Sequence, residues 1–330
     1  MKYPDNFLSF PQHGKTAFSI SRLGKISSCF NKYNFFLLVT SLAFLTSSFF
    51  LFPDAAAAST SRLTGVELGK ALEQGLKNGQ AIWLDDGKDK FFAIFNPDQS
   101  GQPKGGVIIL HDADSQPDNP EVIQPLRREL PLHGWVTISI QLPYLDNPNN
   151  YADHQETINN RINSAITYMH NAGISNLVLL GHGTGTLAAT SYLANQPNGF
   201  IQAFVAISLG ILHENDATDS IISQLEKITL PILDIYGSND LDLVTSSAKV
   251  RARAARISSN IATRNNQLGA YMRSAIAKSN NQKQQGYISY RQIRIEGASH
   301  DFSGSESQLT KRIIGWLERH AKGVAITSSR

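Results

Sequence analysis

Short apolar runs alternate with helical patterns over most of this chain, from about residue 80 to residue 321. The expected strands, in chain order, are residues 107–110, 135–140, 176–180, 201–207, 230–236 and 287–295. The intervening and terminal helical patterns lie at residues 122–130, 154–172, 188–194, 219–227 and 309–321. Strands that alternate with helices form βαβ units. The pattern therefore predicts an α/β fold with a mainly parallel sheet and helices on both of its faces.

Two features before this alternation extend the prediction. The dipeptide Asp86-Gly87 separates the apolar runs 81–84 and 91–95, which is a strong signal for a β-hairpin. The hairpin should add antiparallel strands at one edge of the sheet. Residues 59–79 carry leucines and a valine at helical spacing and predict an amphipathic helix.

The first 58 residues have the composition of an export leader. Residues 35–52 hold no charged side chain, basic residues dominate before them, and four alanines follow at 55–58. This order is typical of a secretory signal, so we expect a leader over 1–58 and a single domain over 59–330. Export to a periplasm is the expected location. An uncleaved anchor in the inner membrane is the alternative, since the apolar run is nearly long enough to span a bilayer.

Charge and cysteine content exclude several classes of function. Of 30 basic and 27 acidic residues, five and two precede residue 59, so 25 of each remain in the expected domain. This balance gives no reason to expect nucleic-acid binding. The only cysteine, Cys29, lies in the leader, so the domain has neither a disulfide nor a thiol site. No cofactor and no metal site is expected.

Polar residues gather directly after four of the expected strands. The segments are 111–115 (HDADS), 181–186 (GHGTGT), 237–240 (GSND) and 296–301 (EGASHD). The carboxyl ends of parallel strands meet at one edge of a sheet, and sites form there in α/β proteins. We therefore expect the candidate site to combine residues from these four segments.

The order of these segments resembles the α/β-hydrolase superfamily over roughly residues 80–325. Gly181-His182-Gly183-Thr184-Gly185 matches the frame of its G-x-S-x-G nucleophile elbow. Asp240 looks like the acid of the triad, His300 looks like its histidine, and the loop 111–115 corresponds to the loop that supplies an oxyanion amide. The leader, the H-x5-P-D pattern that begins at His111, the helix sequence PLRREL and the GHGTG elbow together resemble the exported bacterial DUF3530 proteins, which implies a fold rather than an activity.

The elbow departs from the superfamily pattern at the nucleophile, where Gly183 stands instead of Ser, Cys or Asp. No acyl-enzyme can form at the usual atom. We therefore expect a catalytically altered or non-catalytic protein that binds a small-molecule or envelope ligand. Asp240 and His300 would be remnants of the triad, and the candidate binding residues are His111, Asp112, His182 and Thr184. We also expect Gly183→Ser to restore weak ester hydrolysis that depends on His300.

Other interpretations stay open at this point. A hydrolase acting on esters or amides could use a relocated nucleophile, Ser115, Thr184 or Ser208, served by His300 and Asp240. Thr184 and Thr186 equally fit the start of a helix, where threonine accepts amide hydrogen bonds. Metal-assisted hydrolysis would use His111, Asp112 and Asp114 together with His182 or His300, although their spacing is not diagnostic. His300 and Asp240 could also be a pair that only stabilises two loops.

A long basic segment separates the expected acid from the last strand. There is no acidic residue between Asp242 and Glu296, and ten basic residues lie in this interval. Residues 243–286 are expected to form a helical cationic insertion near the site. Its charges either form a solvated helix face or contact an anionic lipid surface, a polysaccharide or an acidic partner.

Overall fold

The computed structural model describes residues 65–144, 153–195, 199–211, 221–257 and 290–321. The chain divides into two units, Met1–Ser61 and Arg62–Arg330, and all described residues lie in the second. The expected leader and residues 258–286 of the cationic insertion lie outside the described residues. Within these ranges, no helix combines the length and apolarity that crossing a membrane requires.

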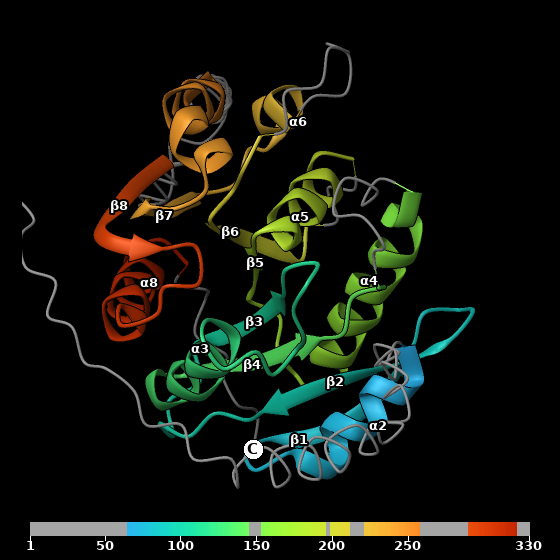
Figure 1. Cartoon of the computed structure of the whole chain (residues 1–330). Helices are drawn as coiled ribbons and strands as arrows, with labels where there is room; N and C mark the ends of the chain where they lie inside the picture. The colour runs from blue at the N-terminus through green and yellow to red at the C-terminus, as the bar shows by residue number, and fades with distance from the viewer. Residues whose placement is uncertain (1–64, 145–152, 196–198, 212–220, 258–289, 322–330) are drawn as a thin grey trace, which may run out of the picture. The chain divides into compact units, whose positions relative to one another are not determined.

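Among the described residues, eight strands form one mixed sheet with the order β1-β2-β4-β3-β5-β6-β7-β8. The strands are β1 (Gln80–Asp85), β2 (Lys90–Asn96), β3 (Gly105–Leu110), β4 (Trp135–Ile140), β5 (Leu177–His182), β6 (Ile201–Ile207), β7 (Ile232–Asn239) and β8 (Tyr290–Ser299). The β1-β2 and β2-β4 pairs are antiparallel, and every other pair is parallel. Both predictions, the parallel sheet and the antiparallel hairpin at its edge, are confirmed (Figure 1).

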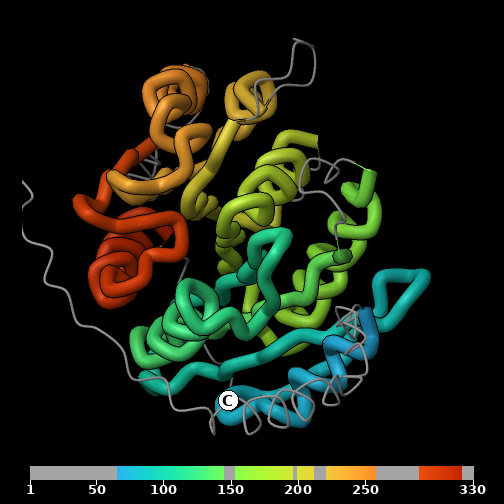
Figure 2. Tube along the Cα trace, in the orientation of Figure 1, coloured from blue at the N-terminus to red at the C-terminus, as the bar shows by residue number. Residues whose placement is uncertain are grey.

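The helices cover both faces of the sheet, as predicted (Figures 1 and 2). One face carries α3 (Ile123–Glu129), followed by a short 3₁₀ turn at Leu130–His133, and α8 (Glu306–His320). The other carries α4 (Gln155–Asn171), α5 (Thr184–Asn195) and α6 (Ile221–Lys227). The N-terminal helix α2 (Gly65–Gly75) packs on Trp83 and Phe92 of the hairpin at Gly69.

The central strands are continuous apolar runs because helices bury both of their sides. In β3, Ile108 joins the core under α4 and α5, and its neighbour Ile109 joins the core under α3 and α8. Every residue of β3, β4 and β5 is buried. This packing holds the strand ends in place, and the polar loops follow directly after them.

The hairpin turn is held by the side chain of Asp86. Its Oδ1 accepts hydrogen bonds from the amides of Lys88 (3.0 Å) and Asp89 (2.8 Å). Its Oδ2 accepts a 3.0 Å hydrogen bond from Arg161 Nε on α4. The turn signal in the sequence is therefore also a tertiary anchor for the edge of the sheet.

Three elements extend further toward the loops than the apolar pattern predicts. Strand β5 includes Gly181-His182, β7 runs to Asn239 and β8 runs to Ser299. Helix α5 begins at Thr184, before the expected residue 188. His182 and Thr184 are therefore part of regular elements, and Asp240 and His300 directly follow strand ends.

The described start of the cationic insertion is a helix at residues 242–257, and its residue Arg251 is buried. Arg251 Nε and Nη2 lie 3.0 and 3.2 Å from the two carboxylate oxygens of Asp234 on β7. Tyr290 and Gln292 of β8 also donate to Asp234, at 2.8 and 2.9 Å. Arg251 therefore anchors the helix to the sheet inside the protein, and it is neither a solvated charge nor a contact for an anionic surface.

Candidate functional site

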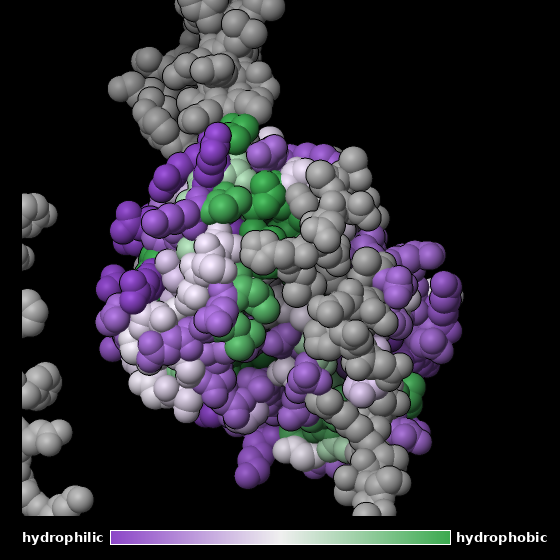
Figure 3. All heavy atoms as spheres, turned by 45° about the horizontal axis from the view of Figure 1, so that its top comes forward, coloured by the Kyte–Doolittle hydropathy of each residue, from purple (hydrophilic) through white to green (hydrophobic). Residues whose placement is uncertain are grey.

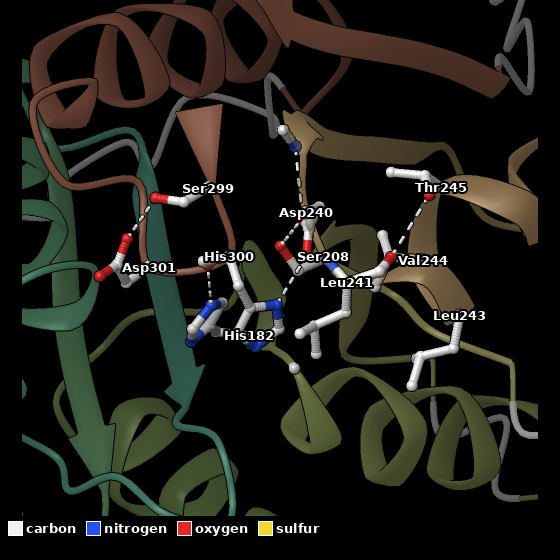
Figure 4. Close-up of polar contacts among 12 residues, drawn as sticks. His182, Ser208, Asp240, Leu241, Leu243, Val244, Thr245, Ser299, His300 and Asp301 are labelled. Carbon is white, nitrogen blue, oxygen red and sulfur yellow. Dashed lines mark hydrogen bonds and ion pairs between the residues drawn. The ribbon is translucent and has the colours of Figure 1, made fainter. Parts of the chain in front are cut away.

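His300 and Asp240 form a close pair beyond the ends of β8 and β7 (Figure 4). His300 Nδ1 lies 2.7 Å from Asp240 Oδ1. Asp240 is held in turn by the Ser208 hydroxyl, which donates to Oδ2 at 2.5 Å, and by the Leu241 amide, which donates to Oδ1 at 2.9 Å. Ser208 follows β6 and has a positive φ of 56°, a conformation uncommon for a residue with a side chain. Residues that follow three different strands, β6, β7 and β8, thus meet at the Asp240 carboxylate.

The second ring nitrogen of His300 faces another carboxylate. His300 Nε2 lies 3.0 Å from Asp112 Oδ2. Asp112 Oδ1 accepts three hydrogen bonds, from the Thr184 amide (2.8 Å), the Thr184 hydroxyl (2.7 Å) and the Ala113 amide (2.7 Å). The Asp112 carboxylate therefore bridges the elbow and the histidine.

This carboxylate occupies the space that a nucleophile side chain would take. Gly183 has a φ of 54°, and an ideal Cβ on it would lie 2.3 Å from both Cγ and Oδ2 of Asp112. In the elbow that this segment resembles, the amide after the nucleophile belongs to the oxyanion hole. Here that amide, from Thr184, is already bonded to Asp112.

The flanking glycines of the elbow are required by close packing. An ideal Cβ on Gly185 would lie 2.6 Å from the carbonyl oxygen of His111, and one on Gly181 would lie 2.6 Å from the carbonyl oxygen of Gly185. The backbone at the start of α5 therefore packs closely against the ends of β3 and β5. As a result, the elbow and the loop that carries Asp112 lie in direct contact.

The two carboxylates determine the charge of His300. Burial alone would lower its pKa, but the hydrogen bonds and charges of Asp112 and Asp240 outweigh burial and raise the pKa to about 9. Burial opposes the charge of each carboxylate, yet the bond to His300 holds the pKa of Asp112 and of Asp240 below the ordinary range. At neutral pH the site is an imidazolium between two carboxylates.

His111 and His182 hold the backbone around this cluster. His111 Nδ1 lies 2.6 Å from the Asp112 carbonyl oxygen, and His111 Nε2 accepts the Leu142 amide at 3.0 Å. Both ring nitrogens are thus occupied, and burial lowers the pKa of His111 to about 4. His182 Nε2 lies 3.0 Å from the carbonyl oxygen of His300, and burial also lowers the pKa of His182.

None of the three hydroxyls considered as relocated nucleophiles forms a hydrogen bond with His300 in the described part of the chain. Thr184 donates to Asp112, Ser208 donates to Asp240, and Ser115 Oγ is buried with no partner among the described residues. Both ring nitrogens of His300 face carboxylates instead. Within the described ranges, no three His, Cys, Asp or Glu side chains are arranged to hold a metal ion.

Sequence reasoning named Asp112 as a binding candidate but missed its contact with His300. The available signal was the coincidence of two features: the elbow lacks its nucleophile, and the loop that supplies the oxyanion amide carries a carboxylate. Proximity of this loop to the elbow follows from the fold. The rotamer that turns Asp112 inward does not follow from the sequence pattern.

The fold is shared with solved α/β serine hydrolases. Two structures of Est1E from Butyrivibrio proteoclasticus, one with ferulic acid bound, match 73% of this chain and 98% and 99% of their own chains. Their TM-scores are 0.51 and 0.52, and their identities are 14% and 13%. A dienelactone hydrolase homologue from Klebsiella pneumoniae matches 74% of this chain and 99% of its own, at 15% identity and a TM-score of 0.52. A serine hydrolase homologue from Coxiella burnetii matches 73% of this chain and 99% of its own, at 13% identity and a TM-score of 0.51. At these identities the likeness shows the α/β-hydrolase fold alone.

No curated protein of known role matches this chain. A family described as "Protein of unknown function (DUF3530)" matches it over residues 36–157 and 146–270. Together the two segments span more than half of the chain and include the Asp112 loop, the GHGTG elbow and Asp240. This α/β-hydrolase-fold chain, with a carboxylate in place of the nucleophile, belongs to the DUF3530 family.

Proposed function

We propose that this protein is a catalytically altered member of the α/β-hydrolase fold that does not perform serine-type acyl transfer and serves in ligand binding. The observation that carries the proposal is the position of the Asp112 carboxylate, which fills the nucleophile space above Gly183 and occupies the Thr184 amide. His300 and Asp240 stay assembled beside it.

Three requirements of acyl transfer are unmet in this arrangement. Residue 183 supplies no attacking atom. An oxyanion amide is bonded to a negative charge that would repel a tetrahedral oxyanion. His300 is held as an imidazolium, with its pKa raised to about 9, and so cannot accept a proton from a hydroxyl near neutral pH.

The surroundings of the cluster indicate the kind of small-molecule or envelope ligand that it would accept. The side chains of Asp112 and His300 keep about a quarter of their surface exposed, at 22% and 24%, so the cluster is reachable. Leu241 beside it is 48% exposed, and hydrophobic residues gather in an uneven band on the face shown in Figure 3. Two carboxylates and one imidazolium carry a net negative charge. We therefore propose a neutral or cationic ligand with an apolar part.

The test is an ester and amide hydrolysis screen with the wild-type chain and His300→Ala, at pH values from 6 to 10. We expect both proteins to give the same background rate with nitrophenyl esters and anilides. Ester turnover by the wild type that disappears in His300→Ala would overturn the proposal.

A second candidate function follows from the same contact, with Asp112 itself as the nucleophile. Its Oδ2 would attack an electrophilic alkyl carbon, whose leaving group departs with the bonding pair, and an ester of Asp112 would form. Loss of the Asp112 charge would lower the pKa of His300, so His300 could then deprotonate a water. The hydroxide would attack the ester carbonyl and expel the alkoxide, which takes the proton from His300 and leaves as the alcohol, and the Asp112 carboxylate is regenerated.

Isotope labelling separates this candidate from a non-catalytic site. After a single turnover of a reactive epoxide or alkyl halide in ¹⁸O-water, one labelled oxygen should be found in the peptide that contains Asp112. Asp112→Asn should take up no label. Unlabelled Asp112, together with an unchanged substrate, would exclude the carboxylate nucleophile.

We further propose that the protein is exported to the periplasm and that its leader is removed. The support is the order of basic, apolar and small residues over 1–58. Fractionation and N-terminal sequencing should find a soluble chain that begins near residue 59. Intact protein fixed in the inner membrane would favour the anchor.

The basic residues of 243–286 other than Arg251 are proposed to contact an anionic lipid surface. Binding to anionic vesicles should then fall steeply with added salt. Equal binding to neutral and anionic vesicles would leave a solvated helix face as the better interpretation.

A further inference from the structure

A cavity of about 450 Å³ lies between the beginning of β8 and the helix α8, at the last described strand of the sheet. The two elements are neighbours in Figures 1 and 2. The residues that line it are Arg291, Ile293, Lys311, Arg312, Gly315, Trp316, Arg319 and His320. The cavity is distinct from the Asp112 site, because His300 follows the opposite end of β8.

The lining carries an uncompensated positive charge. Arg291, Lys311, Arg312 and Arg319 line the cavity, and none of the described residues that line it is acidic. None of these four side chains has an ion pair or hydrogen bond in the described part of the chain. On α8, Lys311 and Arg319 lie four residues before and four residues after Gly315, on one row of the helix surface.

His320, which also lines the cavity, lies in the positive potential of the neighbouring arginines. Burial lowers its pKa, and the charges of Arg319 and Arg291 lower it further. A bound anion would reduce this positive potential.

Trp316 gives the cavity part of an apolar wall. Its side chain is 1% exposed and its indole Nε1 is buried, so the N–H does not open into the cavity and the ring edge alone lines it.

Gly315 keeps this space open. It lies in the interior of α8, where glycine is among the least favourable residues for a helix. The nearest atoms to an ideal Cβ there are the Arg319 guanidinium nitrogens at 3.8 Å, an ordinary contact distance. Packing would therefore tolerate a side chain at residue 315, and its absence leaves room beside the arginines.

We propose that this cavity binds a phosphate-bearing anion, with the phosphate among the arginines and an apolar part of the ligand against Ile293 and Trp316. Guanidinium groups match the geometry of phosphate oxygens and hold them through paired hydrogen bonds. Charged residues on an edge strand also discourage strand pairing, but that role does not explain the cations on α8. The inference is independent of the function proposed for the Asp112 site.

The test is isothermal titration calorimetry of the full chain with inorganic pyrophosphate and with phenyl phosphate. We expect saturable binding that weakens at least tenfold in an Arg312→Gln, Arg319→Gln double variant. Arg294→Gln is the matched control, because Arg294 lies on the same strand, pairs with Glu296 and does not line the cavity. Its affinity should stay within twofold of the wild type.

One further variant separates a built site from general charge attraction. Gly315→Leu leaves the charge unchanged but places a side chain in the cavity. It should weaken phenyl phosphate binding severalfold, with the fold verified by circular dichroism. No binding of either probe, or an equal loss in Arg294→Gln and the double variant, would overturn the proposal.

Vesicle arms of the experiment identify the source of the phosphate. Binding of phenyl phosphate, with equal binding of the wild type and Gly315→Leu to phosphatidic acid vesicles, would assign the cavity to a free phosphorylated molecule. Binding to phosphatidic acid vesicles that phenyl phosphate displaces, and that Gly315→Leu abolishes, would assign it to a lipid headgroup. Either result supports a phosphate site.

Discussion

The carboxylate of Asp112 lies where a side chain on Gly183 would begin, with Asp112 Cγ only 2.3 Å from an ideal Cβ. The two positions are therefore coupled: residue 183 has to be glycine while Asp112 points inward. The positive φ of Gly183, 54°, adds a second reason, since side chains rarely adopt this conformation. The loss of the nucleophile and the inward carboxylate are one structural feature.

Gly183→Ser alone should remain inactive toward esters. From the sequence alone we expected it to restore weak activity, but the structure shows that the new side chain would collide with Asp112. The strain should also destabilise the fold by about 1–3 kcal/mol, which urea unfolding would measure. A His300-dependent esterase in the single variant would contradict this prediction.

The double variant Asp112→Gly, Gly183→Ser should gain weak esterase activity. Removing the carboxylate frees the Thr184 amide and lets His300 approach the new hydroxyl. Adding His300→Ala should abolish the gain, and Asp112→Gly alone is the matched control, which should stay inactive. If the double variant is folded and still inactive, then more of the oxyanion geometry has been lost than the Asp112 contact accounts for.

Asp112→Asn should lower the pKa of His300 from about 9 toward the ordinary value of 6.5. The substitution keeps the side-chain shape but removes one of the two negative charges that stabilise the imidazolium. Titration of the His300 ring signals by NMR would measure the change. An unchanged pKa would mean that Asp112 does not face His300 in solution.

The same shift predicts how the free energy of unfolding depends on pH. Because the pKa of folded His300 is raised, its contribution is fully present below about pH 6.5 and is lost as the pH rises through about 9. The lowered pKa values of Asp112 and Asp240 act at the other end, where stability is lost as the pH falls below their ordinary value. Urea unfolding between pH 6 and 10 should show a steeper loss for the wild type than for Asp112→Asn.

Arg251→Ala should destabilise the fold by about 3–5 kcal/mol, because it leaves the buried Asp234 carboxylate without its cation. Urea unfolding would measure the loss. Arg253→Ala on the same helix is a suitable control, since Arg253 is exposed, and it should change stability by less than about 0.5 kcal/mol. Equal effects of the two substitutions would argue against the internal anchor.

Gly315→Ala should stabilise the fold by about 0.5–1 kcal/mol, the difference in helix propensity between the two residues. The nearest atoms are 3.8 Å from the new methyl group, so no clash offsets the gain. Thermal or urea unfolding would measure it. A loss of stability would show that the space beside Gly315 is filled in the folded protein.

The fold was predictable because its determinants are local. Continuous apolar runs such as Val107–Leu110 identify buried strands, Asp86-Gly87 marks the hairpin turn, and helical spacing identifies the layers that cover them. The order of motifs after the strands then predicted which residues meet at one edge, and the pairing of Asp240 with His300 agrees with that placement. The strand and helix ends near the site were less predictable, because polar motif residues interrupt the apolar pattern.

What the sequence determined by itself is therefore the α/β architecture, the position of the candidate site and the absence of a nucleophile at Gly183. Only the tertiary structure decided which group occupies the space of the missing nucleophile side chain. The contacts of Asp112 join residues separated by 72 positions at Thr184 and by 188 positions at His300. Periodicity and motif spacing describe the backbone near each residue. The direction of a side chain such as Asp112 depends instead on amides and charges that distant segments bring together only when the sheet is assembled.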